Sequence, residues 1–307
     1  MISGSVVTPR NFPSAPIPIP PMKNPRLPLA FSALGLFATA CSPDDSATAP
    51  QVDPVDAFGF TSVEEAREHL GDYADVFVAA DAGLTLRATQ YDAFEDDLTD
   101  YYLRGYYRDP VTGRLGDGGD YHIGAFGLVY SQEAGDYIRV SQLADDRHET
   151  DLAPLFGEVR EVVVERPRGT TLVSTPLHVP RKLDAKIAGL GQVEGSTATA
   201  IARNGTTVSF EADDANEHGV VAYTLWSGSQ LGVSAQEIDP TTRVQRAVLL
   251  PDEGSATLPQ SLFEGMPEGA VVSLWMIRGD VELVEANDLL FSFTSIDETK
   301  FVLALTD

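Results

Sequence analysis

Short runs in which hydrophobic and polar residues alternate dominate the chain from residue 84 onward. A period of two puts successive side chains on opposite faces of a β-strand, so each run predicts a strand. Ser62-Val63-Glu64-Glu65 precedes these runs and matches a capping box, which predicts a short helix over residues 62–71. The strands predicted after this helix are residues 84–88, 101–108, 121–130, 137–143, 161–165 and 171–174.

A second series of apolar runs follows Pro180-Arg181-Lys182, with turn residues between the runs. Seven or so short strands within about 120 residues are typical of an antiparallel β-sandwich. Arg278-Gly279-Asp280 lies between two of the runs and predicts a tight turn rather than an adhesive motif. The strands predicted in this series are residues 197–202, 207–211, 220–226, 244–250, 270–276, 281–284, 289–294 and 301–305.

The stretch from Ala256 to Phe263, followed by Gly269 to Trp275, resembles the E-to-F region of fibronectin type III-like modules. The resemblance supports a fold and does not bear on activity. We therefore predict a mainly β protein in which a mostly β domain with an N-terminal helix, residues 57–178, is followed by an antiparallel immunoglobulin- or fibronectin III-like β-sandwich, residues 179–307. Trp226 and Trp275 are expected to be core residues of facing sheets in the second domain.

The N-terminal part has the layout of a secretory signal peptide: a basic segment at residues 22–26, an apolar run, and the small residues before Cys41. The apolar run covers about 14 residues, whereas a transmembrane helix needs about 20. The segment resembles the lipobox of bacterial lipoproteins. That resemblance implies that Cys41 is acylated, that the protein is exported and anchored to a membrane, and that Ser42 directs it to the outer membrane.

This interpretation divides the N-terminal region into three segments. Residues 1–21 are rich in proline and are predicted to be a mis-assigned extension, with translation beginning at Met22. Residues 22–40 form the signal peptide, and residues 41–56 form the acylated cysteine and a flexible tether. The alternative is a buried apolar segment that ends in an ordinary core cysteine.

The chain is strongly acidic, with 46 Asp and Glu residues, 21 Lys and Arg residues and a formal net charge of −25. Residues 1–40 hold three basic residues (Arg10, Lys23 and Arg26) and no acidic one, so their removal lowers the net charge to −28. A field of this sign repels nucleic acid and anionic lipid surfaces. The charge therefore argues against nucleic acid as a partner. The lipobox resemblance implies the membrane as a partner, through acylated Cys41, and we also expect an envelope protein or glycan.

Motifs for catalysis are missing from the sequence. Cys41 is the only cysteine, so its acylation leaves no thiol for a disulfide, a nucleophile or a zinc site. We find no Gly-x-Ser-x-Gly, no His-Glu-x-x-His and no phosphate-binding glycine-rich loop. We predict no enzymatic activity and no cofactor, and we expect the five histidines to be ordinary surface or turn residues.

Acidic residues cluster in several loops, and Asp109, Asp117 and Asp120 share a glycine-rich one. Ca²⁺ takes six to eight oxygen ligands, which loops between strands can supply. The spacing does not match an EF-hand. A structural Ca²⁺ site at these three residues is therefore kept as the alternative to solvated turns.

Tyrosines gather in the first predicted domain, and Tyr101, Tyr102, Tyr106 and Tyr107 lie in one predicted strand. Aromatic rings with neighbouring polar groups can stack on sugars or contact a protein partner. The alternative is that these rings fill the core or cap its rim. We expect a non-catalytic, lipid-anchored envelope protein that binds or scaffolds another molecule. Two alternatives are a polysaccharide-binding accessory protein that uses these tyrosines and a carboxylate-dependent hydrolase.

Overall fold

The computed structural model describes residues 60, 62–91, 99–133, 135–140, 149–166, 169–194, 196, 198–233 and 242–306. Cys41 and the three predicted N-terminal segments therefore lie outside the described residues. Within the described part the protein is mainly β with a short N-terminal helix, as the sequence predicted.

The predicted capping box begins helix α3, which covers Val63–Leu70. The Ser62 hydroxyl accepts a hydrogen bond from the backbone N–H of Glu65 at 3.1 Å, which satisfies one of the open donors of the first turn. The helix ends at Gly71, whose φ of 58° suits glycine, and the 3₁₀ helix η1 (Gly71–Phe77) follows. Together α3 and η1 bury an apolar face that includes Leu70 and Phe77.

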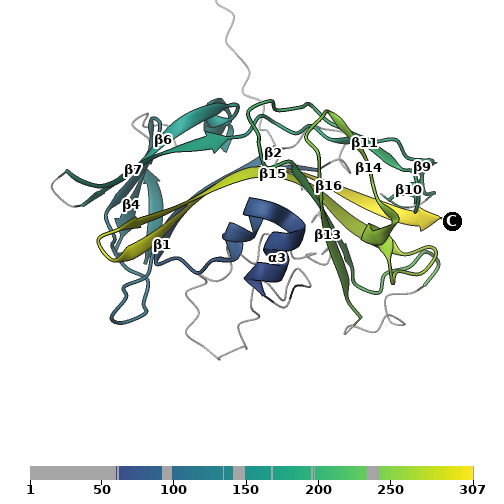
Figure 1. The fold of residues 1–307 in the computed structure, drawn as a ribbon, viewed down its shortest axis with the longest axis horizontal. Coiled ribbons are helices and arrows are strands. Elements are labelled where there is room, and N and C mark those ends of the chain that lie inside the picture. Colours follow the sequence, from purple (N-terminus) through teal and green to yellow (C-terminus); the bar gives the residue numbers. More distant parts are fainter. Residues whose placement is uncertain are drawn as a thin grey trace, which may run out of the picture.

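A long hairpin runs through the whole molecule (Figure 1). Strands β15 (Val271–Ala286) and β16 (Leu289–Thr306) pair antiparallel along their length. Asn287 and Asp288 join them with φ values of 53° and 63°, as a two-residue hairpin turn requires. Arg278-Gly279-Asp280 lies inside β15, so the predicted tight turn there is wrong. Four predicted strands are therefore parts of two longer ones. Strand β15 contains the predicted strands 270–276, from residue 271 onward, and 281–284, and strand β16 contains 289–294 and 301–305.

The hairpin lies at the centre of an eight-stranded sheet with the order β13-β12-β15-β16-β1-β2. Strand β16 also pairs in parallel with two strands along its other edge. Residues 291–300 of β16 pair with β1, and residues 303–306 pair with β10. The sheet is therefore mixed rather than purely antiparallel. The remaining strands of this sheet are β1 (Ala82–Tyr91), β2 (Thr99–Tyr107), β9 (Gly191–Gln192), β10 (Thr199–Ala202), β12 (Val220–Trp226) and β13 (Val244–Leu250).

Two smaller sheets complete the fold. The five-stranded sheet has the order β5-β4-β3-β6-β7, and the three-stranded sheet has the order β14-β11-β8. The predicted strand 121–130 is two strands, because Gly124 turns the chain with a φ of 55°. The elements are β3 (Asp120–Ile123), β4 (Phe126–Ser131), β5 (Asp136–Val140), η2 (Glu149–Leu155), β6 (Glu158–Arg166), β7 (Thr170–Val179), β8 (Lys186–Ile187), β11 (Thr207–Ser209), β14 (Ser255–Thr257) and η4 (Gln260–Phe263).

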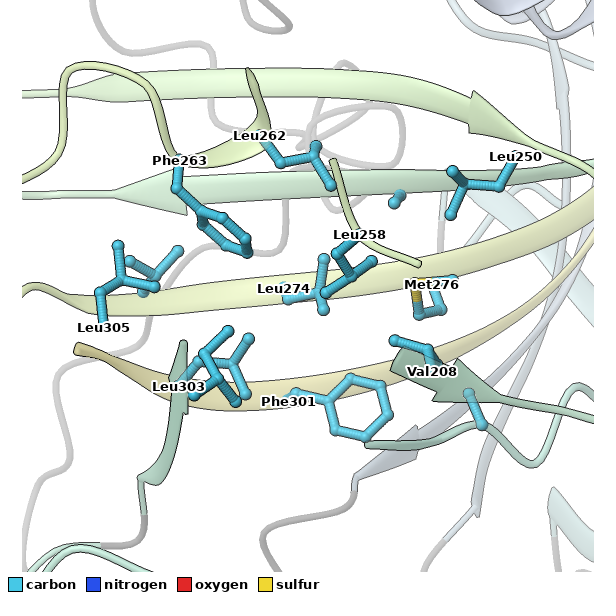
Figure 2. Packing of buried hydrophobic residues seen from close by; sticks show 14 of the residues in the cluster. Val208, Leu250, Leu258, Leu262, Phe263, Leu274, Met276, Phe301, Leu303 and Leu305 are labelled. Carbon is cyan, nitrogen blue, oxygen red and sulfur yellow. The ribbon is translucent and has the colours of Figure 1, made fainter. Parts of the chain in front are cut away.

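The large sheet separates three apolar clusters. The hairpin arches over α3, which packs on the concave face against Tyr223, Trp275 and Ile296 (Figure 1). On the convex face, the five-stranded sheet covers one end and the three-stranded sheet with η4 covers the other. Figure 2 shows the second of these convex clusters, with Phe263 and Phe301 among its buried side chains. Burying each such side chain stabilises the fold by roughly 1.5–3 kcal/mol.

Trp275 is a core residue, as predicted: it is buried under α3 with its ring 5.3 Å from that of Tyr223. Trp226 is only partly buried and packs against the cluster that contains Phe263 and Phe301. The prediction that the two tryptophans lie in facing sheets is wrong, because β12 and β15 belong to the same sheet. Residues of both predicted domains share the large sheet, because β1 and β2 continue it beyond β16. Phe291 and Phe293 of β16 also lie in the cluster under the five-stranded sheet. The boundary near residue 179 stays a prediction.

Candidate functional site

The four predicted site tyrosines of β2 divide between the two faces of the sheet. Tyr101 is buried in the cluster under the five-stranded sheet, where its ring lies 5.7 Å from that of Phe156. Tyr107 packs against the same cluster. These two rings serve the core. Tyr102 and Tyr106 alternate with them and lie half-buried on the concave face, the face that α3 partly covers.

Tyr102 lies between two guanidinium groups. The Arg87 guanidinium carbon lies 5.3 Å from the centroid of the Tyr102 ring, a cation–π geometry. Arg104 Nη1 donates a hydrogen bond to the Tyr102 hydroxyl at 3.3 Å. Arg104 Nη2 donates to the Asp136 carboxylate at 3.2 Å, so this arginine already has an acidic partner.

Tyr106 packs across β1 at Gly83. A Cβ atom at Gly83 would lie 2.8 Å from Tyr106 Cε1 and 2.3 Å from the Ser292 carbonyl oxygen. Only glycine therefore lets the Tyr106 ring pack this closely against the strand. The ring and its neighbours form one surface, which we call the concave tyrosine–arginine face. It consists of Gly83, Thr85, Arg87, Tyr102, Arg104, Tyr106, Ser292 and Thr294.

A charged cluster borders this face. The Glu298 carboxylate is fully buried and accepts a hydrogen bond from the Thr89 hydroxyl at 2.8 Å. Lys300 Nζ lies 3.5 Å from the same carboxylate oxygen and 5.1 Å from the centroid of Tyr91. Burial lowers the pKa of Lys300. The cluster neutralises itself, so it borders the concave tyrosine–arginine face without adding net charge to it.

The three predicted Ca²⁺ ligands serve local structure instead of meeting at one point. The Asp109 carboxylate accepts hydrogen bonds from the backbone N–H groups of Val111 and Thr112, which lower its pKa. Asp117 accepts from the backbone N–H of Gly119 at 3.0 Å, and Asp120 lies in β3. Across the described ranges, no three His, Cys, Asp or Glu side chains are arranged to hold a metal ion.

Sequence reasoning missed a set of buried polar residues in the middle of the hairpin. Arg278, Asp280, Ser295, Asp297 and Thr299 lie between the two convex apolar clusters, and we call them the buried polar belt. Every one of these residues is at most 7% exposed. The only signal in the sequence was the interruption of the apolar pattern, which predicted a turn.

Arg278 is the centre of the belt and has no exposed surface. Its guanidinium donates to the backbone carbonyl oxygens of Arg181 and Glu211, and Nη2 donates to the Asp252 carboxylate at 2.6 Å. Its guanidinium carbon lies 5.9 Å from the Phe210 ring centroid. Arg278 therefore holds three connecting segments against the hairpin.

The rest of the belt holds the segment that follows β7. Asp297 Oδ2 accepts a hydrogen bond from the backbone N–H of Leu183 at 2.5 Å, and Thr299 accepts from that of Ala185 at 3.3 Å. Burial raises the pKa of Asp297 to about 7. Its other oxygen, Oδ1, is buried without a hydrogen-bond partner. A protonated Asp297 fits this environment better than a charged one.

Two histidine side chains contact carboxylates beside the buried polar belt, and the backbone N–H of His178 donates to Asp280 at 3.0 Å. His178 Nε2 lies 3.1 Å from Asp213, and His218 Nε2 lies 3.3 Å from Asp280. The His178 side chain is only 15% exposed, so it is not the surface residue expected from the sequence. Such pairs occur in hydrolases, where the imidazole contacts a nucleophile. Here the Ser295 hydroxyl donates to the His178 backbone oxygen rather than to the ring, so no nucleophile–base pair forms.

A cavity of about 30 Å³ lies between η1 and the hairpin. Its lining is mostly apolar and includes one carboxylate, Asp280. Tyr73 also lines it, and the Tyr73 hydroxyl accepts a hydrogen bond from the Gly279 N–H and donates one to the Gly219 oxygen. A volume of this size holds about one water molecule. The cavity is too small for a sugar ring.

Comparison with protein-family models, curated proteins and solved structures finds no match to this chain. No helix among the described residues is long and apolar enough to span a bilayer.

Proposed function

We propose that this chain is a lipid-anchored bacterial envelope protein that acts as a non-catalytic binding module. The concave tyrosine–arginine face is its binding surface. The observation that carries this proposal is the exposed side of that face, where Arg87, Tyr102 and Tyr106 are half-buried next to the hydroxyls of Thr85 and Ser292.

The second candidate is a polysaccharide-binding accessory protein that uses the same face. Aromatic rings beside hydroxyl and guanidinium donors suit the apolar faces and hydroxyl groups of sugars. The hydrolase alternative has less support, because most glycoside hydrolases use two carboxyl groups across the scissile bond. The cavity beside η1 offers one, and it is small.

The sequence around Cys41 supports the proposed membrane anchor. Each buried CH₂ group contributes about 0.8 kcal/mol, and a single acyl chain binds a membrane only marginally. Two or three chains on Cys41 would hold the protein firmly. Residues 42–56 would then separate the folded part from the membrane, and Ser42 favours the outer membrane.

Replacing Cys41 by serine is expected to remove acylation and release the protein from the membrane. Cells that express the protein would be labelled with an alkyne fatty acid and fractionated. Wild-type protein should carry the label in the membrane fraction, whereas Cys41→Ser should be unlabelled and in the soluble fraction. Label that persists in Cys41→Ser would contradict the proposed anchor.

A photo-crosslinking amino acid at position 292 should capture an envelope component in intact cells. Ser292 lies on the concave tyrosine–arginine face, whereas Ser174 is exposed on β7 and serves as the control position. A crosslinked product from position 292 and none from position 174 would support the binding surface. Equal products from both positions, or none from position 292, would contradict it.

A further inference from the structure

Arg87 is the cation of the concave tyrosine–arginine face for which the described residues supply no acidic partner. Arg104 lies 3.2 Å from Asp136, and Lys300 lies 3.5 Å from Glu298. Within the described ranges, the contact of the Arg87 guanidinium is the cation–π contact with Tyr102, and no carboxylate lies within 4.0 Å of it. Acidic residues outnumber basic ones by 46 to 21 in this chain, so a guanidinium without a carboxylate is unexpected.

The surroundings of Arg87 suit a sugar better than a peptide. Thr85 lies two residues before Arg87 on the same face of β1, and Ser292 lies one row further along on β16. Ile296, the β16 partner of Arg87, is buried in the cluster under α3. The rings of Tyr102 and Tyr106 lie on the same face. The face therefore combines flat rings with the hydroxyl groups of Thr85 and Ser292. The apolar cavity that Ile296 lines has a volume of about 30 Å³, which is too small to anchor a large peptide side chain.

We propose that the concave tyrosine–arginine face binds a glycan that carries uronic-acid carboxylates. Arg87 binds one carboxylate through two parallel N–H···O bonds, and the tyrosine rings contact the sugar rings. This inference rests on the proposed function, because it names the ligand class of the same surface. No covalent step is involved.

The test compares two polymers that differ in the carboxyl group. Polygalacturonate and its carboxyl-reduced derivative would be titrated against the full mature chain carrying Cys41→Ser, which removes the anchor. The titration is done in about 0.15 M salt, where the repulsion between the acidic chain and the acidic polymer is screened beyond about 8 Å and the local contact with Arg87 decides the difference. The acidic polymer should bind about tenfold or more tightly than the reduced polymer, the difference expected for one charged two-pronged contact.

Variants of Arg87 locate the contact. Arg87→Gln should lower the affinity for polygalacturonate about tenfold or more and leave that for the reduced polymer unchanged. Arg87→Lys keeps the charge but loses the planar fork, so its affinity should lie between those of Arg87→Gln and wild type. Arg114→Gln is the matched control, because Arg114 is an exposed arginine in the loop after β2 and is not one of the residues of this face. Circular dichroism would check the fold of each variant.

Each contrary result overturns a different statement. Equal affinity for the two polymers would overturn the carboxylate contact and leave glycan binding. Binding of neither polymer, together with crosslinking from position 292, would overturn the glycan and leave the binding surface. Equal binding of polyglutamate would assign the surface to an acidic peptide and overturn the glycan as well. An unchanged affinity of Arg87→Gln would exclude this face as the site.

Discussion

Arg278→Ala is expected to lower the free energy of unfolding by about 3–5 kcal/mol, the usual cost of breaking a buried ion pair from one side. The substitution removes the hydrogen bonds to the carbonyl oxygens of Arg181 and Glu211. It also leaves the Asp252 carboxylate, which is 4% exposed, without its cation. Urea denaturation followed by tryptophan fluorescence would measure the difference, because Trp275 is buried in the same sheet.

A double variant separates the unpaired charge from the lost packing. Arg278→Met with Asp252→Asn removes both charges and retains an oxygen that can accept the hydrogen bond from Asn216. Neutral replacements of buried ion pairs are often close to neutral in stability, so the double variant should recover much of the loss. If Arg278→Ala alone costs less than about 1 kcal/mol, the ion pair does not hold the belt together.

Local signals in the sequence predicted much of the fold correctly. The predicted strands 220–226 and 244–250 match β12 and β13, and the capping box at Ser62 begins α3. These elements are determined by neighbours in the chain: alternation within one strand, flanking turns, and a hydroxyl three residues from its donor. Their prediction needs no knowledge of distant segments.

The long hairpin could not be predicted in this way. The polar residues within β15 and β16 interrupt the apolar pattern, which locally indicates a turn. Their hydrogen-bond partners come from far along the chain: Leu183 is 114 residues from Asp297, and Arg181 is 97 residues from Arg278. Only the folded structure brings these groups together. Their hydrogen bonds allow Arg278 and Asp297 to be buried within continuous strands.

The candidate site was predicted in part for the same reason. The cluster of tyrosines in β2 was visible in the sequence, and alternation divides it into two pairs. Which pair faces the core depends on where the five-stranded sheet packs, which the sequence does not state. Arg87 was missed because its neighbour Tyr102 lies on another strand, and only the register of β1 with β2 brings the two together.

Asp297→Asn is expected to change how stability depends on pH. Burial raises the pKa of Asp297 from 3.8 to about 7 in the folded state. Between these values the folded protein holds a proton that the unfolded chain releases, so the contribution of Asp297 to stability falls as pH rises through this range. Asparagine keeps an oxygen for the Leu183 N–H and does not ionise. The variant should therefore gain stability relative to wild type between pH 4 and pH 8, by up to about 4 kcal/mol.

Urea denaturation of Asp297→Asn and wild type at several pH values would measure this difference in stability. The control is Asp109, a carboxyl group whose pKa is shifted in the opposite direction. The hydrogen bonds of the Asp109 turn lower the pKa of that carboxyl, so its contribution is present at neutral pH and is lost as pH falls through its folded pKa. Asp109→Asn should therefore lose stability relative to wild type at neutral pH and match it in acid. Parallel plots of stability against pH for Asp297→Asn and wild type would contradict the prediction. They would mean that water or Arg278 stabilises the charged Asp297 carboxylate, so that Asp297 is ionised in the folded protein at neutral pH.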